Sequence, residues 1–230
     1  MALTASPARV VLTGTARAAV RVTNGGTKRV VVDVSRAGFA LTLGGRPRIV
    51  RRGARSAASW LKLRPKRLML PARTTASLLV SATVPPKTEP GDHDALVLMT
   101  TRPSAAARVG VRVRLGVVVL VRAPGKVVRR LELRRLRVAR HGGRRMLELR
   151  VANRGNVTEE LARVNVTISR ARTGRRLATL VAAQRDLRAH TQGILEFRLR
   201  PRTHGAVRAQ VVIPAVSGRA VVRRTYAMRL

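Results

Sequence analysis

Apolar and polar residues alternate with a period of two along most of the chain. Leu147, Leu149 and Val151 fall on one face of an extended segment, and Glu148 and Arg150 fall on the other. A strand places successive side chains on opposite faces, so each such run buries one face and exposes the other to water. Buried parallel strands would instead be apolar throughout. The pattern therefore predicts an all-β chain built from antiparallel sheets.

Turn signals separate these runs at short intervals. Glycine, proline and asparagine favour tight turns, and they cluster at Asn24-Gly25-Gly26, Pro90-Gly91, Pro124-Gly125, His141-Gly142-Gly143 and Asn153-Arg154-Gly155. Many short strands with frequent turns are typical of a sandwich or a barrel.

The chain also repeats its own landmarks. The residues that lead to Asn24 match those that lead to Asn153, and Leu70 with its followers matches Leu187 with its followers. The first copy is longer between these landmarks, and the surplus fits the Arg/Gly/Ser-rich segment 44–59, which we expect to be a loop. Two copies of one strand order indicate two domains of the same fold.

We therefore predict two consecutive immunoglobulin-like antiparallel β-sandwiches, since about a hundred residues suffice for each. The Pro-Gly step after a long apolar strand ends strand pairing. The expected boundaries are residues 1–122 for the first domain, 123–126 for a linker and 127–230 for the second domain.

Charge is the second strong constraint. The chain carries 48 Lys and Arg residues, only five of them lysines, against 10 acidic residues, which gives a formal net charge of +38. Such a field attracts polyanions: nucleic acid, anionic lipid surfaces or acidic cell-wall polymers. A GC-rich genome alone would also favour arginine. Guanidinium groups bind phosphates and carboxylates bidentately, and the candidate polyanion-binding residues are Arg108, Arg112, Arg114, Arg129, Arg130, Arg134, Arg135 and Arg137.

Nucleic acid is the weaker of these candidate partners. Aromatic residues make up 2% of the chain, so few platforms exist on which bases could stack. No nucleic-acid-binding motif is present either. Binding would depend on the phosphate backbone alone and would weaken strongly with salt.

Catalytic and metal-binding patterns are missing from the sequence. There is no cysteine, no nucleophile elbow and no phosphate-binding loop. Asp92-His93-Asp94 could hold a metal in principle, but neighbours on a strand point to opposite faces, so we expect a solvated turn. Glu159 and Glu160 are expected in an exposed loop. We predict a protein that is not an enzyme and that has no cofactor and no metal site.

A signal for export or membrane insertion is not visible in the given sequence. The N-terminal residues lack a basic segment followed by a long apolar run. The longest apolar stretch, Val117 to Val121, is far shorter than the roughly 20 residues that span a bilayer. We therefore expect no integral membrane segment.

A family resemblance is carried by the first half of the chain. Trp60 is followed by Pro65, by Leu68-Met69-Leu70-Pro71, by Val84-Pro85 and by Pro90-Gly91-Asp92. This pattern resembles the bacterial surface proteins that accompany WxL-domain proteins, which carry two consecutive immunoglobulin-like domains. The resemblance implies an extracytoplasmic location at the cell wall or cell surface. It also implies peptidoglycan binding by the first domain and protein or host-surface binding by the second. The pattern is similar to pilus-chaperone-like domains as well.

Three functions follow as hypotheses. The first is a cell-envelope scaffolding protein that binds an anionic cell-wall polymer or a surface protein. The second is a pilus-chaperone-like module that uses strand addition. Its candidate edge is a strand predicted over 108–121, with Val109, Val111, Val113 and Leu115 on one face. The third is a non-specific nucleic-acid binder.

Overall fold

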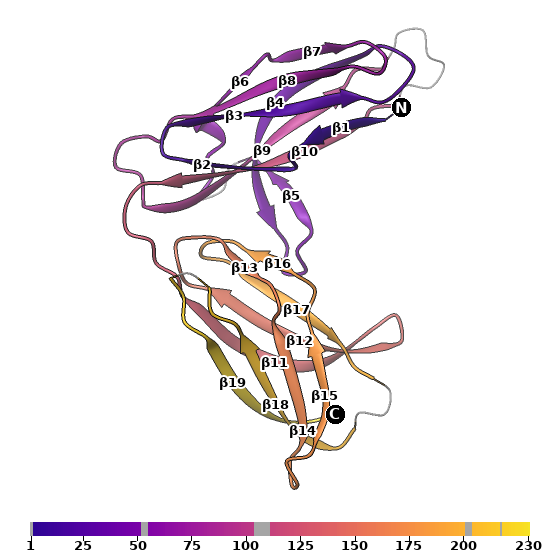
Figure 1. Cartoon of the computed structure of the whole chain (residues 1–230), viewed down its shortest axis with the longest axis vertical. Helices are drawn as coiled ribbons and strands as arrows, with labels where there is room; N and C mark the ends of the chain where they lie inside the picture. The colour runs from indigo at the N-terminus through magenta and orange to yellow at the C-terminus, as the bar shows by residue number, and fades with distance from the viewer. Residues whose placement is uncertain (1, 52–54, 104–110, 201–203, 217) are drawn as a thin grey trace. The chain divides into compact units, whose positions relative to one another are not determined.

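The computed structural model describes residues 2–51, 55–103, 111–200, 204–216 and 218–230. This part of the chain consists of β-strands and one short 3-10 helix, and it divides into two compact units (Figure 1). Met1–Ala40 and Pro47–Lys126 form the first unit, whereas Leu41–Arg46 and Val127–Leu230 form the second. The predicted fold class, two consecutive β-sandwiches, is confirmed. The expected boundaries at residues 122 and 127 stay a prediction.

Two sheets face each other in the first unit (Figure 1). The smaller sheet has the order β1 (Leu3–Ser6), β3 (Ala16–Asn24), β8 (Thr75–Ala82) and β6 (Leu61–Arg64). The larger sheet has the order β2 (Arg9–Thr13), β10 (Arg114–Ala123), β9 (Gly91–Thr101), β4 (Val30–Leu41) and β5 (Pro47–Val50), and β7 (Arg67–Leu70) pairs with β4. In the described part of this unit, β1 with β3, β3 with β8, β8 with β6, β10 with β9, β9 with β4 and β4 with β7 pair antiparallel, whereas β2 and β10 pair in parallel.

The segment 44–59 is not the plain loop that the sequence predicts. It contains β5 and the 3-10 helix η1 (Ala58–Trp60). Trp60 is half-buried and packs against the core. The core itself is aliphatic. The alternating runs of β3 and β8 turn Val20 and Leu78 inward with no exposed surface, and β9 is buried along nearly its whole length, including Val97.

Prolines mark the points where the chain of the first unit changes sheets. Pro65 separates β6 in the smaller sheet from β7 in the larger one, and Pro71 separates β7 from β8. Proline has no N–H to donate to a ladder, so pairing ends there.

The second unit repeats the layered arrangement. One layer contains β11 (Leu131–His141), β12 (Arg144–Asn153) and β17 (Gln192–Arg198); β13 (Glu159–Leu161) pairs with β16 (Arg185–Leu187). The other layer contains β15 (Arg176–Val181), β14 (Asn165–Arg170), β18 (Ala206–Ile213) and β19 (Val222–Arg229). Phe197, Leu149 and Ile168 lie in the core between the layers.

Candidate functional site

Strand β10 presents an edge that is open over part of its length. On one side β10 pairs with β9 throughout, from Arg114 opposite Thr100 to Ala123 opposite Gly91. On the other side β2 pairs with β10 only from Val118 to Arg122. Within the described residues, no strand pairs with Arg114–Val117 on that side. Unpaired strand edges are ready templates for another chain.

The register determines which backbone groups reach this edge. Thr101 N donates to Val113 O over 2.9 Å, so Val113 and every second residue after it point their N–H and C=O toward β9. Val118 N donates instead to Ala8 O, on the opposite side. The N–H and C=O groups of Arg114 and Gly116 therefore point outward from the open edge.

The candidate edge residues are only partly as the sequence predicted. Strand β10 begins at Arg114, so Val111 and Val113 of the predicted strand 108–121 precede it. Arg108 and Val109 lie outside the described residues. Val111 is 61% exposed, whereas Leu115 packs against the core of the first unit. The apolar alternation continues inward through Val117, Val119 and Val121, and the exposed apolar surface belongs to the residues just before the strand.

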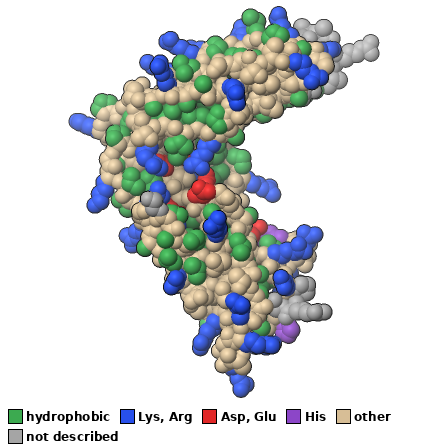
Figure 2. Space-filling view, in the orientation of Figure 1, with side chains coloured by type: hydrophobic (Ala, Val, Ile, Leu, Met, Phe, Trp, Pro, Cys, Tyr) green, Lys and Arg blue, Asp and Glu red, His purple; other side chains and the backbone are tan. Residues whose placement is uncertain are grey.

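Several of the candidate polyanion-binding arginines are already paired with carboxylates. Arg129 Nη1 lies 3.1 Å from Glu159 Oε1, and Arg137 Nη2 lies 2.7 Å from Glu148 Oε2. Arg130 and Arg134 both pair with Glu132. Arg112, Arg114 and Arg135 are exposed. Figure 2 shows Lys and Arg side chains spread over the visible face of each unit rather than gathered in one patch.

The segment Asp92-His93-Asp94 is not the solvated turn expected from the sequence. All three residues lie in β9 and are buried, with Asp92 fully inaccessible. Arg122, opposite Asp92 on β10, donates from Nε and Nη2 to the two carboxylate oxygens over 2.7 Å and 3.1 Å. A bidentate guanidinium satisfies a buried carboxylate that would otherwise be costly.

His93 lies against Trp60, with ring centroids 4.5 Å apart. Its Nε2 lies 2.9 Å from the carbonyl oxygen of Glu89. Burial lowers the pKa of His93 below its ordinary value, although the contact with Glu89 opposes the shift. A neutral His93 is thus a packing partner of Trp60 in the first unit.

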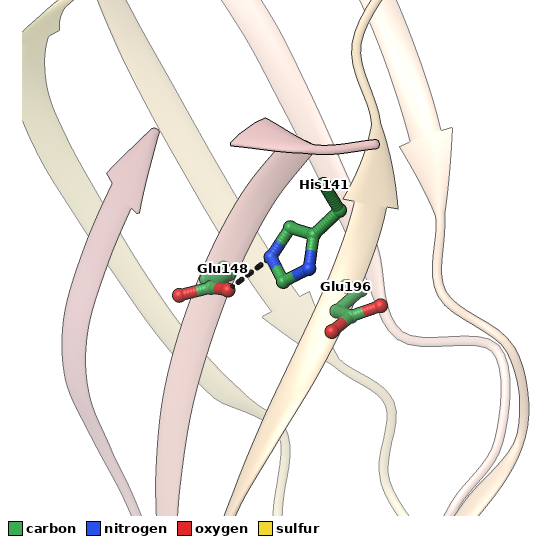
Figure 3. Close-up of side chains that lie close together, drawn as sticks. All are labelled: His141, Glu148 and Glu196. Carbon is green, nitrogen blue, oxygen red and sulfur yellow. Dashed lines mark hydrogen bonds and ion pairs between the residues drawn. The ribbon is translucent and has the colours of Figure 1, made fainter. Parts of the chain in front are cut away.

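His141, Glu148 and Glu196 come together on neighbouring strands of the second unit (Figure 3). Their ligand atoms all lie within 4.8 Å of one another. His141 Nε2 lies 2.7 Å from Glu148 Oε1, while Arg137 Nε donates to Oε2 over 2.8 Å. Burial raises the pKa of Glu148, but the hydrogen bonds from His141 and Arg137 outweigh it and lower the pKa overall.

These contacts favour an ion-pair network over a metal centre. Both carboxylate oxygens of Glu148 are engaged, so a divalent cation would have to displace His141 or Arg137. The adjoining small pocket is lined by Arg135, Arg137 and Arg150, which would repel the cation.

Glu159 is buried rather than exposed as the sequence suggested. It has no accessible surface in β13, and its two oxygens accept from Arg129 Nη1 and Arg219 Nε, each over 3.1 Å. Glu160, its neighbour, is exposed. Within the described residues, no helix is long and apolar enough to cross a membrane.

No family model matches the sequence, and no curated protein matches it either. Solved structures do resemble the fold. The YadV chaperone covers 99% of this chain and 100% of its own at 10% identity, with a TM-score of 0.56. A chain of the CsuC–CsuE chaperone-tip adhesion subunit pre-assembly complex of Acinetobacter baumannii covers 99% and 98% at 12% identity, with a TM-score of 0.51.

A third similar structure is the Salmonella enterica SafA pilin in complex with the SafB chaperone. The matching chain covers 99% of this chain and 96% of its own at 14% identity, with a TM-score of 0.52. The tandem immunoglobulin-like fold extends over the full length of the chain in each case. The fold implied by the WxL-associated resemblance is therefore confirmed, whereas these comparisons give no support to that family itself.

The comparisons also correct the expected partner. The sequence favoured an anionic cell-wall polymer or a surface protein, with nucleic acid second. The similar folds belong to chaperones solved with adhesin or pilin subunits, which overturns that expectation. The net charge favoured a polyanionic partner because it counts every arginine, including those whose guanidinium groups are already paired with carboxylates of the same chain. Arg129, Arg134 and Arg137 are held by carboxylates of their own unit.

Proposed function

We propose that the chain is a pilus-chaperone-like module that captures a pilus subunit by strand addition at the open edge of β10. The observation that carries the proposal is the unpaired edge of Arg114–Val117, in a chain whose whole length has the fold of chaperones solved with such subunits. The proposed role is non-enzymatic, and its proposed location is extracytoplasmic, in the periplasm of a bacterium.

The open edge offers backbone N–H and C=O groups together with apolar side chains, and strand addition uses both. Main-chain hydrogen bonds supply affinity in this mode of recognition, and alternate side chains supply specificity. The outward N–H and C=O groups of Arg114 and Gly116 are the main-chain partners. Val111, Val113 and Leu115 are the proposed apolar contacts, with Val109 as a further candidate outside the described residues.

Arg114→Pro is the sharpest test of this edge. Proline at this position removes an N–H that points away from β9, so the ladder between β9 and β10 is kept. Arg114→Ala is the matched control, because it removes the same guanidinium but keeps the N–H. Each tagged full-length form is expressed in the native host, recovered from the periplasmic fraction and examined by mass spectrometry for co-purified pilin-like subunits.

We expect pilin-like subunits with the wild-type chain and with Arg114→Ala, and their loss with Arg114→Pro. Protection from hydrogen exchange at Gly116 in the purified complex is the second expected result. Equal recovery of the subunit by the proline variant, or a chain found only in the cytosol, contradicts the proposal.

A further inference from the structure

A groove of about 1000 Å³ opens on the first unit, away from the unpaired part of β10. It is lined by residues of β4 and β6, together with Trp60, Lys66 and Pro85. β6 belongs to the smaller sheet and β4 to the larger one, and the two strands do not pair. The groove arises where Pro65 carries the chain from one sheet to the other.

The backbone of β6 is open toward this groove. Among the residues that the structure describes, β6 is the last strand of its sheet and pairs with β8 alone. Thr83 N donates to Trp60 O over 3.1 Å, so Trp60 and Lys62 point their backbone groups toward β8. Leu61 and Leu63 must then point theirs the other way. The contact of Leu61 O with Arg36 Nη1 across the groove agrees with this register.

β4 forms the opposite wall of the groove. Val34 N donates to Lys66 O over 2.9 Å, at the point where the chain runs from β6 into β7. By the same alternation the backbone groups of Arg36, two residues on, point to the same side of β4 as those of Val34. The guanidinium of Arg36 spans the groove and also donates to Ser59 O over 3.3 Å.

The groove is basic along its length. Arg36, Lys62, Arg64 and Lys66 line it, and no acidic side chain does so among the described residues. The indole of Trp60 and the ring of Pro85 add apolar surface. Clefts lined by charge of one sign concentrate ligands of the opposite sign.

We propose that this groove is a second strand-addition site, which binds an extended acidic peptide segment of a partner protein along the free edge of β6. The N–H groups of Leu61 and Leu63 and the C=O of Leu63 provide the ladder, whereas the C=O of Leu61 already accepts from Arg36 Nη1. The four cations select carboxylates on alternate residues of the peptide, while its apolar residues pack against Trp60 and Pro85. This site is independent of the β10 edge.

Trp60 is the only tryptophan of the chain, so its fluorescence reports directly on the groove. The probe is a short synthetic peptide that alternates valine and glutamate, titrated into the full-length chain. Two comparison peptides replace glutamate by lysine or carry N-methyl groups on alternate backbone nitrogens. The lysine peptide removes the charge complementarity. The N-methylated peptide removes the backbone hydrogen bonds to β6 but keeps the negative charge.

We expect a saturable change in Trp60 emission with the acidic peptide alone, weakened by added salt. The double variant Lys62→Glu/Arg64→Glu should lower the affinity roughly tenfold or more. Arg208→Glu/Arg229→Glu, an equal change of charge on exposed residues of the second unit, should leave it unchanged. Arg114→Pro should also leave it unchanged, which separates this site from the proposed subunit-binding edge.

Binding of the N-methylated peptide as tightly as its parent would mean attraction by charge without strand addition, and the proposal would be wrong. Unchanged affinity in Lys62→Glu/Arg64→Glu would place the peptide elsewhere. A response of Trp60 to phosphatidylglycerol vesicles but not to the acidic peptide would make the groove a lipid site and overturn the proposal.

Discussion

The side-chain Nδ2 of Asn153 lies 3.0 Å from the carbonyl oxygen of Leu187. Asn24 makes the equivalent contact with Leu70 over 3.1 Å in the first unit. Each asparagine also accepts, through Oδ1, the N–H of the residue two positions on, Gly155 or Gly26. Both are buried. The repeated landmarks in the sequence therefore mark one repeated structural clamp, which joins the end of a central strand to a segment far along the chain.

Replacing Asn24 or Asn153 by alanine should destabilise only the unit that contains it. Asn24→Ala and Asn153→Ala each leave several buried backbone groups without a partner, so we expect a loss of about 2–4 kcal/mol in the free energy of unfolding. Urea denaturation followed by domain-specific hydrogen exchange measures this loss. Asn165→Ala, at a half-buried position on β14, is the control and should change stability little. Equal effects of all three variants would contradict a clamping role.

Glu159 should be the most sensitive carboxylate of the second unit. The variant Glu159→Gln leaves Arg219, whose side chain is only 3% exposed, without its counter-charge. We expect it to lower the free energy of unfolding by about 3–5 kcal/mol, as for other broken buried ion pairs. Glu132→Gln is the comparison, because Glu132 is partly exposed among Arg130, Arg134 and Arg154. Its loss should cost less than about 1 kcal/mol.

A double variant checks the cause of this sensitivity. In Glu159→Gln/Arg219→Met both partners are neutral, so the penalty should be smaller than the sum of the two single penalties. Additive losses in chemical denaturation would show that the two side chains do not act as a pair.

Acid should weaken the second unit through Glu148. Because the folded pKa of Glu148 is lowered overall, its carboxylate stabilises the fold fully above the unfolded pKa of about 4.3. That contribution is lost as the pH falls through the folded pKa. Between about pH 6 and pH 3, the wild-type free energy of unfolding should therefore fall more steeply than that of Glu148→Gln. Parallel curves in urea denaturation at a series of pH values would rule out this contribution.

Gly155 should not tolerate a side chain. A Cβ at this position would lie 2.2 Å from Val128 O and 2.9 Å from Arg130 N, both of which are backbone atoms that cannot move independently. Gly155→Ala should therefore lower the melting temperature by several degrees. This corresponds to a loss of about 1–3 kcal/mol in the free energy of unfolding, caused by overpacking. Gly25→Ala is the matched control, since its nearest contacts would be at 3.4 Å. Calorimetry that finds the two variants equally stable would contradict this close approach.

The sequence by itself determined the fold class of this protein. Period-two alternation is a local property, and it identified β12 with Leu147, Leu149 and Val151 on its buried face. Glu148, expected on the exposed face, is buried as well. The repeat of Asn24 and Asn153 indicated two domains of one kind. These signals depend only on neighbours along the chain, so no knowledge of the packed state was needed.

Tertiary structure alone decided which polar groups are buried and which edge is free. Asp92 and Glu159 are held inside by Arg122 and Arg219, and these partners are distant in sequence. The open edge of β10 exists because β2 pairs with only part of that strand. Pairing and burial depend on which strands become neighbours after folding. The net charge of the sequence therefore led to the wrong expected partner, a polyanion. The folded chain instead exposes a strand edge to which another strand can add.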